Sequence, residues 1–580
     1  MAILFIGKQH SIFNQFEKND VFYQINANSR KGYSHLSENE LSYYSATPII
    51  KVGNEYKEYE FSGSYEIEKV IEESQNNFSS FNVFKKGNAL FLTISSSRFA
   101  RARMYFTKAE SGFYFSDDIR ELIPYSSKRI NQSAMYSIIK FGNTPEYITS
   151  IEGIYAVPVA SLLTISISQL STMRQIDFGI FKKYFHLTYT LEGGNIYDTE
   201  QILGGIFNYV SKTNFIVPIS GGVDSSLMNF MINERTEKKY PAYYIAFGDN
   251  DPEIKFAREA VKNTKAELDI CTMYPKDFIQ AFEFQTNNLI QPTGEYSTVS
   301  MSHLFREFKF SGFNILDGTL ADGCYGSRNY IDPLSQGKAK VSLIQRKAQE
   351  QISSFLQLYN LPYNDKFYPR DSMVNDFYIQ LMSTYTGPMA NTIFKDAEKF
   401  NKQLLEYWKW YYSLIISKNG VTDEWMKYSI FKMINYASNS TLAKTYDLCG
   451  STNQMIYPFI WKDILNDQGK YSWKEKTQNG VIKYPLKKII ERYASKEFIY
   501  RKKMGMGSSL TEWMKLKENK LFLVDLITKS NSFAEEMIGK NRLHQLLHTF
   551  LQEKHNYFVS ALVEKLATIQ AWSDKNGVKL

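Results

Sequence analysis

The stretch that most constrains the fold is residues 215–226, which read FIVPISGGVDSS. An apolar run with the length of a buried parallel strand leads directly into two glycines. The residues that follow carry their apolar side chains at helical spacing. We therefore expect a strand, a tight glycine turn and a helix N-terminus in direct succession.

This turn has the chemistry of an anion site. Unpaired N–H groups at a helix start point toward a bound phosphate, and the helix dipole favours negative charge there. Gly221 and Gly222 let the backbone approach closely. Asp224 is suited instead to Mg²⁺, which takes oxygen ligands and bridges nucleotide phosphates. The hydroxyl donors to phosphate are Ser220, Ser225 and Ser226. The alternative is an ordinary glycine turn ahead of a helix cap.

The full string SGGVDSS resembles the pyrophosphate-binding loop of the N-type ATP pyrophosphatases. It does not resemble the kinase-type P-loop, because no Gly-Lys-Ser/Thr follows. The resemblance implies ATP and Mg²⁺ as cofactors. It also implies a reaction that releases pyrophosphate and leaves AMP on the substrate.

Strands and helices alternate after this turn, which predicts a doubly wound parallel sheet. We expect strands at Tyr243–Phe247, Leu268–Met273 and Phe313–Leu316, and helices at Glu253–Asn263, Pro275–Leu289 and Met301–Phe308. Ligands bind beyond the carboxyl ends of such strands. The loops after Ile219, Phe247 and Leu316 should therefore converge on one site.

The loop after Leu316 reads LDGTLADGCYG and resembles the L-S-G-E-G-A-D-E-L-F-G-G segment of asparagine synthetases. The resemblance puts Gly318 in the nucleotide site and Asp322 on the metal-binding aspartate, so that Asp224 and Asp322 would share Mg²⁺. Thr319 stands where the family has a glutamate that serves the acceptor, and Gly323 replaces an acid. These changes remove two carboxylates from the reaction centre and leave the acid substrate open.

Three further site residues follow from the same resemblance. The segment PTGEYS resembles E-P-x-x-D-x-S, so Glu295 would offer a carboxylate, the alternative being an acid at a helix start. Backbone groups near Ala246 and Phe247 would read adenine. Lys483 falls on a phosphate-contacting lysine, where it would offset charge on the α-phosphate and the departing pyrophosphate. A solvated surface lysine is the alternative for Lys483.

Asp249, Asp251 and Glu253 follow the second strand of the expected sheet. They are candidates for the site and equally for helix-capping acids. His544 and His548 share one face of an expected helix with leucines and have no glutamate base between them. We interpret these histidines as structural rather than as metal ligands.

The first 169 residues show short strands separated by turns. Expected strands include Ala2–Ile6, Val21–Ile25, Ala89–Ile94, Arg103–Thr107, Gly112–Ser116 and Pro158–Ser166, with a short helix at Met135–Lys140. The segments at 97–106 and 112–122 resemble the glutaminase-type domain of asparagine synthetases, which implies an α+β sandwich of the N-terminal-nucleophile hydrolase type. That glutaminase uses a cysteine at position 2, where this chain has Ala2. An unrelated β-rich domain is the alternative.

The chain thus divides into an inactive glutaminase-like domain at 1–175 and an ATP pyrophosphatase domain with helical additions at 195–580. Residues 170–198 show little periodicity and form the expected crossing between the two. Residues 330–455 read as mostly helical, and their role is open.

Composition excludes several classes of protein. The three cysteines, Cys271, Cys324 and Cys449, form no CxxC pair, which argues against a disulfide framework or structural zinc and favours a reducing, cytoplasmic location. A net charge of +8 is spread over 580 residues, so nucleic acid is not required as a partner. The most apolar segment, Ile151–Ser168, carries Glu152 and Pro158 and is expected to be a buried strand pair, not a membrane span. A homodimer is one possible assembly.

The favoured function is an ATP-dependent ligase or cyclase that adenylates a carboxylate on a small molecule or peptide and joins it to an amine, without glutamine hydrolysis. β-Lactam synthetases and lasso-peptide cyclases are relatives of this kind. Two alternatives stay open. One is ATP-dependent tRNA thiolation, which needs a persulfide-carrying cysteine. The other is a nucleotide-binding protein without catalytic activity.

Overall fold

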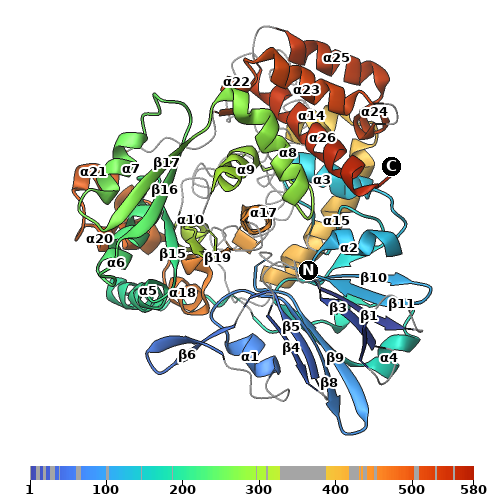
Figure 1. Cartoon of the computed structure of the whole chain (residues 1–580), viewed down its shortest axis with the longest axis horizontal. Helices are drawn as coiled ribbons and strands as arrows, with labels where there is room; N and C mark the ends of the chain where they lie inside the picture. The colour runs from blue at the N-terminus through green and yellow to red at the C-terminus, as the bar shows by residue number, and fades with distance from the viewer. Residues whose placement is uncertain are drawn as a thin grey trace.

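The structure is a computed structural model of the whole chain (Figure 1). For the strands before residue 42, only the backbone is described. The described residues are 2–7, 14–16, 21–25, 33–37, 40–46, 48–59, 67–99, 103–145, 147–185, 187–295, 297–308, 311–326, 387–416, 430, 433–434, 441–449, 453–501, 509–529, 532–552 and 556–579.

The N-terminal part is a sandwich of two six-stranded antiparallel sheets, with strand orders β12-β10-β11-β1-β3-β2 and β14-β13-β9-β8-β5-β4. The first sheet contains β1 (Ala2–Gly7), β2 (Asn14–Phe16), β3 (Val21–Ile25), β10 (Tyr105–Ala109), β11 (Gly112–Ser116) and β12 (Ile154–Ala156). The second contains β4 (Tyr33–Ser37), β5 (Glu40–Tyr44), β8 (Ser80–Lys86), β9 (Ala89–Ser95), β13 (Ser161–Ser166) and β14 (Lys182–Lys183). A small hairpin of β6 (Ile49–Val52) and β7 (Glu55–Glu58) stands beside the sandwich.

Apolar side chains from both sheets meet in one core between them. Its members include Phe81, Leu92, Phe106, Phe115 and Leu163. This core confirms the predicted sandwich. The expected strand pair at 151–168 is wrong in one respect: β12 and β13 do not pair with each other but lie in opposite sheets. Proline and a left-handed residue at Ala160 occupy the crossing between them.

Helix α3 (Gln132–Phe141) connects the sandwich with the rest of the molecule. It begins where the Asn131 side chain accepts a hydrogen bond from the Ala134 N–H, and it ends at Gly142 in the left-handed conformation. It is longer than the predicted helix at Met135–Lys140, and its residues from Ala134 to Ile139 are all buried. It packs against the C-terminal helix α26 (Tyr557–Asn576).

The second part is built on a five-stranded parallel sheet of order β17-β16-β15-β18-β19. Its strands are β15 (Phe215–Pro218), β16 (Tyr240–Ala246), β17 (Ala266–Thr272), β18 (Asn314–Leu316) and β19 (Gln454–Ile456). The chain leaves β15 toward β16 on one side and later returns to β18 on the other, so β15 is the point where strand order reverses. The predicted doubly wound sheet is confirmed, and the glycine turn follows the strand at the reversal, where such sheets bind ligands.

The helices expected between the strands are present, together with further helices that were not predicted. They are α5 (Ile196–Ser211), α6 (Val223–Asn233), α7 (Ile254–Val261), α8 (Phe278–Asn288), α9 (Thr298–Glu307), α10 (Ala321–Tyr325), α18 (Lys462–Gln468) and α20 (Tyr484–Ile490). The single helix expected at Pro275–Leu289 is instead a 3-10 turn, Pro275–Asp277, followed by α8. Strand β14 still pairs in the second antiparallel sheet, so that sheet extends beyond residue 175.

Helices from the C-terminal third cover the junction of the two parts, at the upper right of Figure 1. They are α14 (Gly387–Ile393), α15 (Ala397–Ile416), α23 (Lys517–Ile527), α24 (Phe533–Ile538), α25 (Lys540–Leu551) and α26. The end of the chain returns to the sandwich, because the Ile130 N–H donates to the Lys579 carbonyl at 2.7 Å. Most of the segment expected to be helical at 330–455 lies outside the described residues. Within the described part of the chain, no helix combines the length and apolar character needed to cross a lipid bilayer.

Candidate active site

The glycine turn after β15 is closed by its own serines. The Ser220 N–H donates to the Ser225 hydroxyl at 3.0 Å, and the two hydroxyl oxygens lie 2.9 Å apart. Gly222 immediately precedes α6, and Asp224 lies in the first turn of that helix. Ser226 is fully buried, so its hydroxyl has no access to solvent, whereas Ser220 and Ser225 border the turn. The predicted strand, turn and helix start are all present.

Gly221 is required by the backbone at this turn. Its φ is +63°, and a Cβ there would lie 2.7 Å from the Cβ of Phe256 and 2.9 Å from that residue's carbonyl carbon. Arg501 holds the turn from outside, donating to the Gly221 carbonyl at 2.9 Å and to both Glu253 carboxylate oxygens at 3.1 and 2.8 Å. Its guanidinium also lies 3.6 Å from the centroid of the Phe256 ring. The turn is therefore fixed before any ligand arrives.

Two carboxylates from separate helices converge on one lysine beside the turn. Lys483 Nζ lies 2.5 Å from Asp224 Oδ2 on α6 and 2.6 Å from Asp322 Oδ1 on α10. Burial alone lowers the pKa of Lys483, but the two carboxylates outweigh burial and hold that pKa above its ordinary value. Lys483 thus stays charged at neutral pH. Its backbone is left-handed, with φ of 55°, directly ahead of α20.

The carboxylates of Asp224 and Asp322 fit the implied Mg²⁺. Since both carboxylates reach a single ammonium, their oxygens are close enough to share one cation. Among the described residues no cluster of three or more acidic, histidine or cysteine side chains has metal-site geometry. Two carboxylates with phosphate oxygens and water completing the shell is the arrangement that Mg²⁺ prefers.

The other two loops reach the same edge of the sheet. Gly318 packs on α6, because a Cβ there would lie 3.1 Å from the Cβ of Asp224. Near the expected adenine site, the Phe247 N–H donates to Asp251 at 3.1 Å and the Ala246 carbonyl accepts from Met273 at 2.9 Å. Both groups expected to read adenine therefore already serve internal hydrogen bonds.

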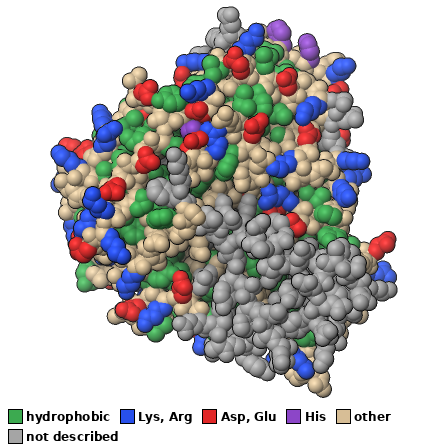
Figure 2. All heavy atoms as spheres, in the orientation of Figure 1, with side chains coloured by type: hydrophobic (Ala, Val, Ile, Leu, Met, Phe, Trp, Pro, Cys, Tyr) green, Lys and Arg blue, Asp and Glu red, His purple; other side chains and the backbone are tan. Residues whose placement is uncertain are grey.

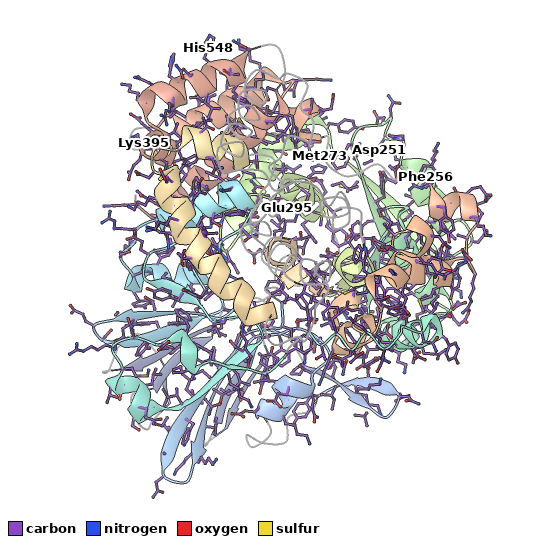
Figure 3. The ribbon with its side chains drawn as sticks, turned by 180° about the vertical axis from the view of Figure 1, so that it is seen from behind. Asp251, Phe256, Met273, Glu295, Lys395 and His548 are labelled. Atoms are coloured by element: carbon purple, nitrogen blue, oxygen red, sulfur yellow. The ribbon has the colours of Figure 1, made fainter. Side chains whose placement is uncertain are left out.

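The three acids after β16 have separate roles. Asp251 accepts hydrogen bonds from Tyr244, Phe247 and Glu253, so it organises its own loop. Asp249 accepts from the Tyr274 hydroxyl at 2.5 Å. Glu253 alone is tied to the glycine turn, through Arg501. Asp251 and Phe256 lie together on the parallel-sheet side of the molecule in Figure 3.

Glu295 lies near the centre of the molecule in Figure 3 and belongs to a buried charged cluster. Its Oε1 accepts from the Ser297 hydroxyl at 3.2 Å and lies 3.5 Å from the ammonium of Lys444 on α17 (Ala443–Leu448). Lys444 also donates to the Ser297 hydroxyl. Burial lowers the pKa of Lys444, while Glu295 and Asp317 act in the opposite direction. Lys444 was not among the residues that the sequence analysis selected, and no motif surrounds it.

The loop that carries Glu295 is held by the N-terminal sandwich. Gln291 accepts from the Ser150 N–H at 2.9 Å and donates to the Tyr105 hydroxyl at 3.3 Å. The Gly294 N–H donates to the Gly142 carbonyl at 3.0 Å, and a Cβ at Gly294 would lie 2.3 Å from the Ile138 carbonyl oxygen. The end of α3 is thus in direct backbone contact with the loop that carries Glu295.

The remaining candidates lie away from this site or are closed to solvent. His544 and His548 are exposed on α25, and His548 is at the far end of the molecule from Glu295 in Figure 3. Cys324 is fully buried, and burial raises the pKa of its thiol to about 12. On the described surface in Figure 2, basic and acidic side chains are interspersed.

Comparison with known proteins agrees with this arrangement. The family model described as Asparagine synthase matches residues 209–574. The protein named Asparagine synthetase [glutamine-hydrolyzing] 1 from Bacillus subtilis (strain 168) is 22% identical over 470 residues, which cover 78% of this chain and 70% of that protein. The family uses ATP in ligase chemistry, and the match spans the glycine turn, both carboxylates and Lys483. The chain belongs to the asparagine synthase family.

Proposed function

We propose that this protein activates a substrate carboxylate with ATP, forms an acyl-adenylate and pyrophosphate, and transfers the acyl group to an amine without hydrolysing glutamine. The observation that carries the proposal is the convergence of Asp224, Asp322 and Lys483 beside the glycine turn. Two carboxylates that could share one cation and the ammonium of Lys483 lie together beside the turn, which supports a site for Mg²⁺ and nucleotide phosphates.

Each residue has a distinct part in the first step. The helix start at Gly222 and the hydroxyls of Ser220 and Ser225 bind phosphate oxygens. Asp224 and Asp322 hold Mg²⁺, which neutralises charge on the nucleotide. With Mg²⁺ on the two carboxylates, the Lys483 ammonium beside them would face the phosphates. There it stabilises the charge that grows as the bond between the first two phosphates breaks.

The proposed independence from glutamine rests on the distribution of thiols. The first 270 residues contain no cysteine, so the antiparallel sandwich has no thiol to act as nucleophile. Cys271 lies on β17 in the other part of the chain, and burial raises the pKa of its thiol to about 11. The amine therefore comes from solution or from the substrate itself.

The thiolation alternative is not supported by the cysteine nearest the site. A persulfide carrier must be reachable and readily ionised. Cys324 is buried against Phe459, and its raised thiol pKa keeps it protonated at neutral pH.

Pyrophosphate release tests the proposal. Purified protein is given ATP, Mg²⁺, hydroxylamine and one acid at a time: L-aspartate, L-glutamate, or short linear peptides with a free N-terminal amine and an Asp or Glu side chain. We expect at least one acid to give pyrophosphate and a hydroxamate. Asp224→Asn should abolish both products, whereas Asp269→Asn, an exposed change on β17, should not. Pyrophosphate absent with every acid would contradict the proposal.

A further inference from the structure

A cavity of about 210 Å³ lies where the hairpin of β6 and β7 meets the parallel-sheet part of the molecule. The hairpin comes from the N-terminal part and packs on α5 (Figure 1). The parallel-sheet part supplies the first residues of two strands, Asn314 on β18 and Gln454 on β19. Because the glycine turn follows the carboxyl end of β15, this cavity lies toward the other end of the sheet. It is therefore a different site from the glycine turn.

The lining of this cavity is polar and almost uncharged. Glu58 is the one charged side chain among the described residues that line it. With no lysine or arginine in that lining, a carboxylate or phosphate would lose its hydration without gaining a partner. The lining therefore favours neutral and cationic groups. The uncharged hydrogen-bonding side chains include Asn76, Asn77, Tyr209, Thr213, Asn314 and Gln454.

Glu58 gives the cavity a negative charge. The Tyr209 hydroxyl donates to Glu58 Oε1 at 3.3 Å, and no lysine or arginine of the described chain forms an ion pair with this carboxylate. Its neighbour Lys57 is paired with Glu55 instead, at 3.3 Å. A carboxylate that still has an oxygen available is a strong partner for an ammonium group, because the hydrogen bonds between them are assisted by charge.

One wall of the cavity is aromatic and carries an unused donor. The ring centroids of Tyr209 and Trp461 are 5.8 Å apart, and both residues line the cavity. Trp461 is only 2% exposed, yet its indole N–H has no acceptor among the described residues. The half-buried side-chain amide of Gln454 makes no hydrogen bond within them either. The rings favour a cation near their faces, and the two polar groups call for a ligand that also carries an oxygen acceptor.

We propose that this cavity binds a small organic ammonium compound whose other end is an uncharged amide or hydroxyl group. The ammonium group pairs with Glu58 beside the aromatic wall. The oxygen at the other end accepts from the Trp461 indole and from the Gln454 amide. The ligand is small, because about 210 Å³ is below the roughly 300 Å³ at which sites for drug-sized molecules begin. Since both parts of the molecule supply the walls, the ligand also joins the two parts.

Titration calorimetry on the whole protein without nucleotide tests this proposal. The probes are glycinamide and L-valinamide at about pH 6.5, where their amino groups are protonated. Glycine and L-valine are controls that add a carboxylate, and isobutyramide is a control that lacks the ammonium group. We expect at least one amino amide to bind and to raise the melting temperature. Each control should bind at least about 10-fold more weakly, because it lacks the charge match with Glu58 or adds an unpaired anion.

A pair of variants on β7 tells whether binding occurs in this cavity. Glu58→Gln removes the charge but keeps an acceptor for Tyr209, so the affinity for the amino amide should fall by about 10–100-fold. Glu55→Gln is the matched control, because Glu55 is an exposed acid of the same strand that does not line the cavity. Its affinity should equal that of the parent. Both substitutions are at exposed positions, so the melting temperatures without ligand should stay close together.

Two kinds of result would overturn the proposal. If neither amino amide binds, or if the controls bind equally well, the cavity does not select an ammonium compound. If Glu58→Gln binds the amino amide as the parent does, the amino amide occupies another place in the molecule. Neither result bears on the proposed ligase function, which pyrophosphate release tests separately.

Discussion

The two parts of this molecule differ in which features of the family they retain, the architecture alone or the architecture together with the reactive side chains. The antiparallel sandwich keeps its two sheets, its core and α3, but it contains no cysteine with which to hydrolyse glutamine. The parallel-sheet part keeps its architecture and also has Asp224, Asp322 and Lys483 in contact beside the glycine turn. A nucleophile is one atom and is lost by one substitution. A phosphate site depends on backbone direction and several loops, so it survives as a unit.

The sandwich also contacts the other part of the molecule. It holds the loop that carries Glu295, through Ser150, Tyr105 and Gly142. These contacts fix the position of the Glu295 loop relative to the sandwich. The predictions below test whether the two parts are divided in this way.

The largest effect should come from the parallel-sheet part. Lys483→Met removes the charge next to Asp224 and Asp322, so acid-dependent pyrophosphate release should fall by about 10²–10³-fold. Lys488→Met, on the helix α20 that directly follows Lys483 and ion-paired with Glu491, is the control and should stay near the parent rate. An unchanged rate in Lys483→Met would remove the phosphate role from this lysine.

The seam between the two parts should make stability depend on pH. Burial raises the pKa of Glu564 on α26 from 4.5 to about 7, so the folded state holds a proton there that the unfolded chain releases. The stability of the parent relative to Glu564→Gln should be constant below pH 4.5, fall as pH rises to about 7, and then level off. The total change should be on the order of 3 kcal/mol. Urea unfolding of both proteins across this range measures the difference. Stability curves that run parallel with pH would show that folding does not raise the pKa of Glu564.

A smaller effect tests the contact between α3 and the Glu295 loop. Gly294→Ala would place a Cβ 2.3 Å from the Ile138 carbonyl oxygen and 3.0 Å from the Gly142 Cα. Both are backbone atoms, which cannot easily move aside. We expect a loss of about 1–3 kcal/mol in unfolding free energy, together with slower amide formation. Gly179→Ala, where the Cβ would meet only the Asp177 side chain, is the matched control. Equal behaviour of the two variants would show that the sandwich is an independent appendage.

The smallest effect is expected from restoring the thiol. Ala2→Cys puts a cysteine at the family's nucleophile position, but Ser97, Ala100 and Arg103 still replace the family's Asp, Gly and Pro nearby in the pattern. Ammonia release from glutamine should therefore stay at the level of the parent protein. Clear glutaminase activity would show that the sandwich lacks only the cysteine thiol, which would contradict the comparison made above.

The elements best predicted from sequence are those whose local pattern of residues is distinctive by itself. The strands at Val21–Ile25 and Gly112–Ser116 and the sequence SGGVDSS were assigned correctly from local pattern. Strand β5 was missed because Tyr43 and Tyr44 are both fully buried, on opposite faces, and so give no alternation. Burial on both faces removes the period-two signal.

The site residues that were missed depend on contacts between distant segments. Lys444 lies in a helix whose Lys, Thr and Asp side chains are buried, so its pattern looks like that of a surface helix. Its partner Glu295 is far away in the chain. The contact of Gly294 with Gly142 joins residues 152 positions apart in the two parts, which no local pattern records.

The central claim is that a carboxylate attacks the first phosphorus of ATP. Incubation with an acid carrying oxygen-18 in its carboxylate, followed by mass spectrometry of the nucleotide products, tests it most directly. The account requires AMP that carries the heavy oxygen, with unlabelled pyrophosphate. Heavy oxygen in inorganic phosphate with ADP as the nucleotide product would contradict it.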